Sequence, residues 1–181
     1  MTRSPLTIEH ALLGFLHQQP LHGYELYQQL TNPAGLWLVW RIKQSQLYAL
    51  LAKLEDEGYI SADVQPQENR PPRKVLRLTP AGLDAYERWL LKPVAHPRSM
   101  RQEFLAKFYF ARQRDVDTAQ RLIEVQRAQC EAWLTAQHRQ NQAEAPSFEE
   151  TVNRFRLSQI QAILTWLDSC EEMLANWSAT E

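Results

Sequence analysis

The fold is decided by residues 44–59, which read QSQLYALLAKLEDEGY. Leucines recur here at positions i, i+3, i+4 and i+7, which predicts an amphipathic helix with one buried stripe. Gly58 follows the last turn, where a residue in the left-handed conformation commonly ends a helix. The buried stripe is predicted to consist of Leu47, Leu50, Leu51 and Leu54.

Two shorter helices are predicted before this one. Apolar residues at helical spacing run from Ile8 to Leu16, and Pro20 follows the end of that pattern. His22-Gly23 opens the next helical pattern, which stops at Asn32-Pro33. The chain therefore begins with three consecutive helices.

Two strands and a fourth helix are predicted after residue 59. Alternating apolar and polar residues predict short strands over residues 60–64 and 74–78. Residues 67–73 between them form a polar tip stiffened by proline. Thr79-Pro80 predicts a helix start, with threonine as the N-cap and proline in the first turn. Three helices, a two-stranded wing and a helix are typical of a winged helix-turn-helix domain, which we assign to residues 1–91.

The second half of the sequence is predicted to be helical throughout. Residues 92–99 contain Pro93 and Pro97 and are expected to form a stiff, extended linker. Residues 100–181 are expected to form a helical dimerisation domain. The predicted fold class is therefore mainly α with a small two-stranded β wing.

A winged helix reads DNA with its third helix in the major groove, while the hairpin contacts the backbone or the minor groove. The formal net charge is −1, so a basic surface has to be local. The polar face of the third helix supplies groups that bond to bases and phosphates: Gln44, Ser45, Gln46, Tyr48 and Lys53. The wing supplies a run of cations without an intervening acid: Arg70, Arg73 and Lys74.

The order of four motifs resembles the PadR family of bacterial transcriptional regulators. The motifs are HGYEL at residues 22–26, SQLY at 45–48, LEDEGYI at 54–60 and RKVLRLTPAG at 73–82. Residues 101–110 are also similar to the start of the C-terminal domain in the PadR subgroup with the longer tail. The resemblance implies a homodimeric repressor that binds a palindromic operator and is released by a small effector, aromatic or phenolic in type. It also implies DNA contact by Tyr24, Ser45, Gln46, Tyr48, Arg70, Arg73 and Lys74.

The last predicted helix carries more apolar surface than one neighbouring helix can cover, which favours a symmetric dimer. The residues expected at the dimer interface are Ile160, Ile163, Leu164, Leu167 and Leu174. An aromatic effector is expected to lie against rings that the linker brings together. The candidates are Trp89, Phe104, Phe108 and Trp133.

Other functional classes are not favoured by the sequence. There is no stretch of about 20 apolar residues for a membrane span, and the polar start resembles no signal peptide, so a cytoplasmic protein is expected. Neither Cys130 and Cys170 nor the histidines have metal-ligand spacing, and no motif of an active site occurs, so we expect no metal, no cofactor and no enzyme. Two alternatives stay open: a winged-helix protein that acts through a protein partner, or a ligand-binding module without sequence-specific DNA binding.

Overall fold

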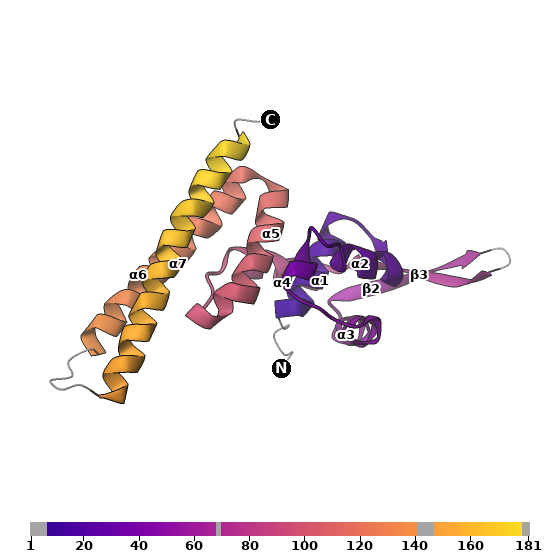
Figure 1. The fold of residues 1–181 in the computed structure, drawn as a ribbon. Helices are drawn as coiled ribbons and strands as arrows, with labels where there is room; N and C mark the ends of the chain where they lie inside the picture. Colours follow the sequence, from indigo (N-terminus) through magenta and orange to yellow (C-terminus); the bar gives the residue numbers. More distant parts are fainter. Residues whose placement is uncertain (1–6, 68–69, 141–146, 179–181) are drawn as a thin grey trace. The chain divides into compact units, whose positions relative to one another are not determined.

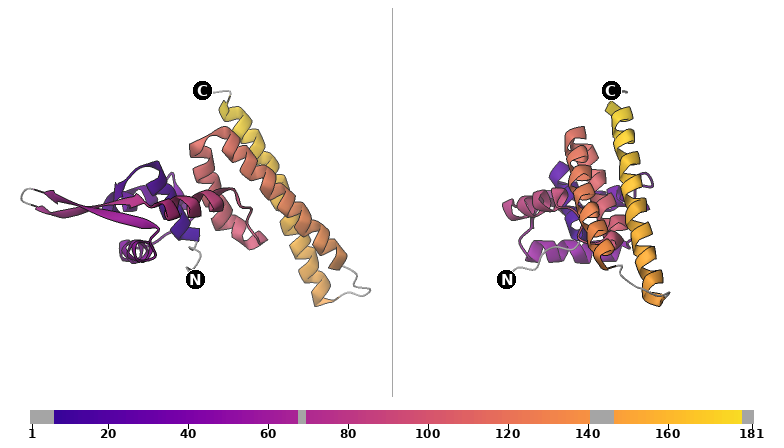
Figure 2. Two further views of the ribbon diagram at one scale, coloured as in Figure 1. Left: turned by 180° about the vertical axis from the view of Figure 1, so that it is seen from behind. Right: turned by 90° about the vertical axis from the view of Figure 1, so that its left-hand side faces the viewer.

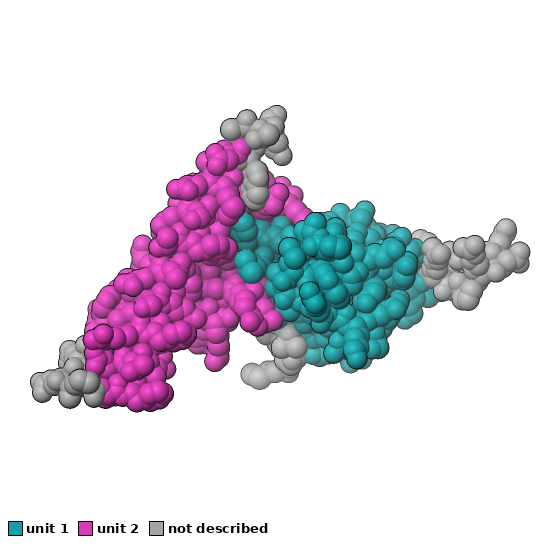
Figure 3. Space-filling model, viewed as in Figure 1, with its two compact units in different colours: residues 1–90, 105–110 teal, residues 91–104, 111–181 magenta. Residues whose placement is uncertain are grey.

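The computed structural model describes residues 7–67, 70–140 and 147–178 and divides the chain into two compact units (Figure 3). Unit 1 comprises Met1–Leu90 and Leu105–Phe110. Unit 2 comprises Leu91–Phe104 and Ala111–Glu181. Each unit is described by itself.

Unit 1 is built on helices that bury one apolar stripe each. On α3, Leu47, Leu51 and Leu54 are buried as predicted, whereas Leu50 is only half-buried. The helices with residues in this unit are α1 (Thr7–Gln18), α2 (Gly23–Leu30), α3 (Gln44–Asp56), α4 (Pro80–Leu91) and α5 (Leu105–Arg114), with the 3₁₀ turn η1 (Leu36–Leu38) before α3.

The end of α3 and the start of α4 are joined by capping contacts. Gly58 has φ 77°, and the N–H of Tyr59 donates to the carbonyl of Leu54 at 2.9 Å, which is the left-handed helix end predicted from the sequence. The Thr79 hydroxyl accepts a hydrogen bond from the N–H of Gly82 at 3.1 Å and donates to the Gly58 carbonyl at 2.7 Å. Thr79 therefore caps α4 and also fixes it to the turn that follows α3.

The sheet contains one strand that the sequence analysis did not predict. Strands β2 (Ile60–Gln67) and β3 (Arg70–Leu78) form the wing hairpin, and β1 (Leu21–His22) pairs with β3, so that the antiparallel order is β1-β3-β2. β1 has only two residues, too few for an alternating pattern to mark it in the sequence.

The wing strands are longer than the sequence pattern indicated and extend away from the helices of unit 1 (Figure 1). The prediction of a loop over residues 67–73 was therefore wrong in extent, because the strands reach Gln67 and resume at Arg70. The register is irregular between Gln65 and Gln67. Pro66, Pro71 and Pro72 lack the N–H groups that a regular ladder needs, which explains the irregularity.

Unit 2 is an antiparallel pair of long helices, α6 (Val116–Gln140) and α7 (Phe148–Ser178), which lie side by side in both views of Figure 2. A 3₁₀ turn, η2 (Pro97–Ser99), and a π-helical turn, η3 (Met100–Phe104), precede them. A hydrogen bond connects residues 92–99, which were expected to form a linker, to α6. There the N–H of Val94 donates to Oε1 of Gln126 at 2.8 Å, and both residues are buried.

Candidate nucleic-acid interface

The outer face of α3 presents the polar residues that the sequence analysis singled out. Gln44, Ser45, Gln46 and Tyr48 are all exposed, and Lys53 is half-buried. The leucines on the opposite face are buried in the core, so they hold the helix and its polar face in a fixed position. Such a face can bond to base edges and phosphates in a major groove.

The start of α3 combines a side-chain cap with the positive end of the helix dipole. The N–H of Lys43 donates to Oε1 of Gln46 at 2.9 Å, which holds the Gln46 oxygen toward the helix start. The Gln46 amide nitrogen still offers donors to a base. The first N–H groups of a helix have no partner within the helix, and the helix dipole favours an anion there, so a DNA phosphate is a suitable ligand for this end.

Two tyrosines that were expected to contact DNA are exposed, Tyr48 on α3 and Tyr24 on α2. Tyr24 is 57% exposed and Tyr48 is 46% exposed. The Tyr48 ring lies so close to Gly23 that a Cβ at that position would be 2.8 Å from Cε1 of Tyr48. Glycine in the His22-Gly23-Tyr24 motif therefore makes room for the ring that projects from α3.

His22 connects the start of α2 to the wing. Its N–H donates to Oε2 of Glu25 at 2.8 Å, and its Nδ1 lies 2.9 Å from the carbonyl oxygen of Lys74 in β3. The sequence analysis did not predict the contact with β3, because residues 52 positions apart share no local signal. Through it, the short strand β1 and α2 position the base of the wing.

Two cations of the wing, the predicted Lys74 and also Arg77, already contact carboxylates. Lys74 Nζ lies 3.5 Å from Oε2 of Glu55, and Arg77 Nε lies 2.9 Å from Oδ2 of Asp63. All four side chains are more than a third exposed, and exposed ion pairs of this kind are weak. A phosphate can therefore compete for either cation. The backbones of Arg70 and Arg73 lie in β3, but their side chains are outside the described part of the chain.

Lys53 has a partner inside the protein. Its Nζ lies 2.7 Å from Oε1 of Glu9, a residue of α1 that is fully buried. The sequence analysis missed this pair, since Glu9 lies in an ordinary amphipathic pattern and its partner is 44 residues away. The pair joins α1 to α3, and the role of Lys53 in DNA binding stays a prediction.

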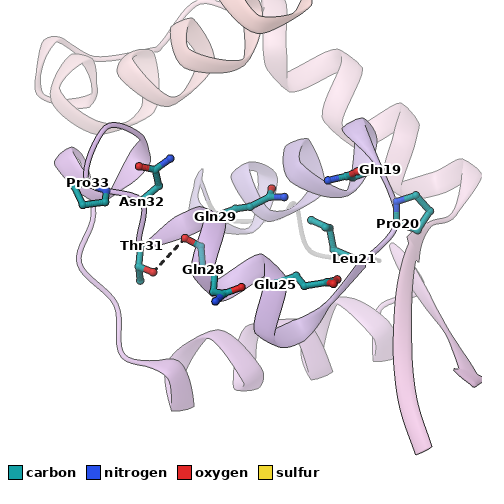
Figure 4. Close-up of a pocket in the computed structure, with 9 residues that line it drawn as sticks. All are labelled: Gln19, Pro20, Leu21, Glu25, Gln28, Gln29, Thr31, Asn32 and Pro33. Atoms are coloured by element: carbon teal, nitrogen blue, oxygen red, sulfur yellow. Dashed lines mark hydrogen bonds between the residues drawn. The ribbon is translucent and has the colours of Figure 1, made fainter. Parts of the chain in front are cut away.

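A groove of about 630 Å³ lies beside α2 (Figure 4). Its lining is mostly polar and comes from the segment after α1, from β1, from α2 and from the turn after α2, and it includes no lysine or arginine. This groove is therefore a poor place for a phosphate. It is lined by Gln19, Pro20, Leu21, Glu25, Gln28, Gln29, Thr31, Asn32 and Pro33.

The four predicted effector residues are divided between the units. Trp89 and Phe108 belong to unit 1, whereas Phe104 and Trp133 belong to unit 2. Phe104 is fully buried with its ring edge-on to Trp166, and Phe108 and Trp133 are half-buried.

Trp89 is the most unusual of these residues. Its ring is stacked on His10 with centroids 5.2 Å apart, and Nζ of the fully buried Lys107 lies 5.3 Å from its ring centre. The indole N–H is buried and has no acceptor within the described residues. An unsatisfied buried donor is costly, and a ligand with an acceptor atom would relieve that cost. Nothing in the local sequence indicated that Lys107 would be buried.

The predicted dimer residues fall into two groups on α7. Ile160, Leu167 and Leu174 are buried in the single chain, where α6 packs along α7. Ile163 and Leu164 are only half-buried. Large apolar residues that the sequence analysis did not assign to the interface are exposed on the same helix: Phe148, Phe155 and Met173.

Two other site types find no support in the described part of the chain. No helix there is both long enough and apolar enough to cross a membrane. No group of three or more histidine, cysteine, aspartate or glutamate residues there could hold a metal ion.

Comparison with known proteins gives a consistent result for both halves of the sequence. Residues 12–88 match the Transcriptional regulator PadR-like family, and residues 100–175 match the family described as Virulence activator alpha C-term. The negative transcriptional regulator PadR of Bacillus subtilis is 32% identical over 103 residues, which cover 57% of this chain and 56% of the relative. A probable transcriptional regulator of Mycobacterium tuberculosis is 28% identical over 93 residues, covering 51% of this chain and 48% of the relative. The chain thus spans about half the length of the curated relatives it matches.

Solved structures of PadR from Bacillus subtilis are also similar to the chain. The complex with operator DNA has 27% identity and a TM-score of 0.46, covering 91% of this chain and 97% of that chain. The complex with p-coumaric acid has 25% identity and a TM-score of 0.43, covering 94% of this chain and 99% of that chain.

Proposed function

We propose that the chain binds double-stranded operator DNA through α3 and the β2–β3 wing, because residues 12–88 match the Transcriptional regulator PadR-like family. The observation that carries this proposal is the exposed polar face of α3, which buried leucines hold on the core. The family consists of transcriptional regulators, which confirms the expectation that the chain is not an enzyme.

The proposed regulator is a cytoplasmic repressor that acts as a homodimer on a palindromic operator. Residues 1–91 bind DNA, residues 92–99 link the domains, and residues 100–181 dimerise. In a symmetric dimer, two copies of α3 read half-sites separated by about one helical turn or a multiple of it.

The exposed rings on α7 support the dimer. Phe148 is 83% exposed and Phe155 is 67% exposed. With Met173 and the half-buried Ile163 and Leu164, they leave apolar surface that a second copy can cover through an isologous interface. Sedimentation equilibrium tests this point, because Phe155→Ser should weaken the dimer whereas a change at buried Leu167 should unfold the helix pair.

A small aromatic effector is proposed to release the protein from DNA. The indole N–H of Trp89, which has no acceptor among the described residues, supports this proposal because a ligand with an oxygen acceptor would satisfy it. Such a ligand regulates DNA binding only if its affinity differs between the conformation that binds DNA tightly and the conformation that binds DNA weakly.

The decisive experiment is the affinity for duplexes from the protein's own promoter region, measured by fluorescence anisotropy over a range of salt concentrations. Each phosphate that the protein neutralises should contribute a slope of about −0.9 to log K against log salt. A flat dependence would favour the alternatives of a protein-partner module or a ligand-binding module without sequence-specific DNA binding.

The proposal that Gln46 recognises particular DNA bases is tested by Gln46→Ala, with Gln28→Ala as the matched control. Both residues are exposed helical glutamines, but Gln28 lines the polar groove on α2. Gln46→Ala should relax the preference at particular bases, and Gln28→Ala should not. Gln46 also caps α3, so Gln46→Ala is expected to lower stability as well. Urea unfolding of both variants measures that loss of stability separately from the change in base preference. Unchanged base preference in Gln46→Ala would refute the reading role.

A further inference from the structure

The segment between α2 and α3, residues 31–43, is much longer than the turn of about 3–4 residues that joins two helices in a helix-turn-helix motif. We call it the connector. The N–H groups of Val39 and Trp40 both donate to the carbonyl of Leu36 at 2.9 Å, which forms a tight turn. Leu36 is 1% exposed and anchors this turn in the core of unit 1. The residues that follow it are therefore held in a defined place directly before α3.

The connector carries positive charge that no acid compensates. Residues 26–54 contain no aspartate or glutamate, although the whole chain has 21 acidic and 20 basic residues. The cations in this range are Arg41, Lys43 and Lys53. Lys53 pairs with Glu9, whereas within the described part of the chain neither Arg41 nor Lys43 pairs with a carboxylate. Both of these residues are exposed, so the connector presents two available cations just before α3.

Arg41 is oriented by an aromatic ring. Its Cζ lies 5.6 Å from the ring centre of Trp37, which is half-buried and is thus itself supported by the protein. An indole is the aromatic group that attracts a cation most strongly. A guanidinium that meets a ring through its face keeps its N–H edge free, and this edge matches two oxygens of a phosphate. An exposed arginine that has no acid and is already oriented is well suited to bind a phosphate.

We propose that Arg41 binds a phosphate of the operator DNA beside the groove that α3 enters, and that Trp37 is a positioning residue for its guanidinium. This inference rests on the proposed function and adds to it a contact outside α3 and the wing. Phosphates carry no sequence information, so the contact should set affinity rather than base preference. The neighbouring Leu38 is 78% exposed, so contact with a protein is the other role that the test has to separate.

The test is the affinity of the full chain for a duplex from its own promoter region and for an unrelated duplex, measured by fluorescence anisotropy over a range of salt concentrations. Arg41→Gln should weaken binding to both duplexes about tenfold. It should also reduce the slope of log K against log salt by about 0.9 for each subunit bound. Arg88→Gln is the matched control, because this arginine of α4 is 74% exposed and pairs with Asp84 at 2.8 Å. The control removes the same charge and should leave affinity and slope unchanged.

The role of Trp37 is tested by a double-mutant cycle with Arg41. Trp37→Leu should weaken DNA binding about threefold when Arg41 is present. It should have no effect in the Arg41→Gln background, because no guanidinium is then left to orient. Trp37→Phe keeps a ring face and should retain most of the affinity. Urea unfolding of the same variants measures any loss of stability separately from the loss of DNA affinity.

The results that would overturn this inference differ from those that would overturn the proposed function. If Arg41→Gln matched Arg88→Gln in affinity and salt slope, Arg41 would not bind a phosphate, although the chain would still bind DNA. A changed oligomeric state of Arg41→Gln in sedimentation equilibrium, with the salt slope unchanged, would make the connector a protein contact instead. Equal effects of Trp37→Leu with and without Arg41 would refute the positioning role of Trp37. A wild-type chain that bound neither duplex would refute the proposed function and this inference together.

Discussion

The pair between Lys53 and Glu9 leads to the most discriminating prediction, because Lys53 was expected to contact DNA and the structure gives it a partner in the protein. Replacement of Lys53 by methionine removes the ammonium that lies 2.7 Å from a fully buried carboxylate. Loss of one partner of a fully buried pair costs about 3–5 kcal/mol, whereas an exposed pair contributes about 0–1 kcal/mol. The Lys53 side chain is 36% exposed, so solvent screens part of the interaction. We expect Lys53→Met to lower the free energy of unfolding by about 1–3 kcal/mol.

The assay is urea unfolding followed by circular dichroism, in parallel with DNA affinity measured against salt. The double variant Glu9→Gln/Lys53→Met should recover much of the loss, because the buried carboxylate that lost the Lys53 ammonium is then removed as well. Lys43→Met is the control at the other end of α3, where the lysine is exposed. It should change stability by less than about 0.5 kcal/mol.

The structural role of Lys53 would be refuted by one pattern of results. In that pattern, Lys53→Met keeps the stability of the wild type, the double variant shows no coupling, and the salt slope falls by about one phosphate contact. Lys53 would then bind DNA, as the sequence analysis expected.

Three further predictions concern other parts of the chain. Asp115→Ala should cost about 1 kcal/mol in urea unfolding at neutral pH, because Asp115 caps α6. The hydrogen bonds from Thr118 hold the pKa of this carboxyl below its ordinary value of 3.8, so its contribution to stability is complete above that pH and is lost as the pH falls through the lowered pKa. Urea unfolding over a series of pH values below 3.8 should therefore show a shrinking difference between variant and wild type. Burial raises the pKa of the Cys170 thiol to about 11, so this thiol should resist a disulfide reagent at pH 8 in the native protein and react on unfolding; rapid reaction of the folded chain would contradict its burial. Gly23→Ala should displace the Tyr48 ring and weaken DNA binding more than it lowers stability, and an unchanged DNA affinity in anisotropy would show that the position of this ring is unimportant.

The sequence predicted the elements whose signals are local. The leucine stripe of α3, the left-handed end at Gly58 and the Thr79-Pro80 start of α4 each depend on neighbours along the chain, and all are present in the structure. The order of these elements, together with the motifs, predicted the resemblance to the PadR family, whose model matches residues 12–88. The exposure of Gln44, Ser45, Gln46 and Tyr48 follows from the same helical periodicity.

Tertiary structure alone decided which charged and aromatic residues already have partners within the protein. Three contacts join residues that are distant in sequence: Lys53 with Glu9, Lys107 with Trp89, and His22 with the carbonyl of Lys74 in β3. No periodic pattern encodes such contacts. The same holds for α7, where helical spacing placed Ile160, Ile163 and Leu164 on one apolar face but could not say how much of it α6 covers. Periodicity fixes the direction of a side chain from its helix, whereas burial depends on what the folded chain brings against it.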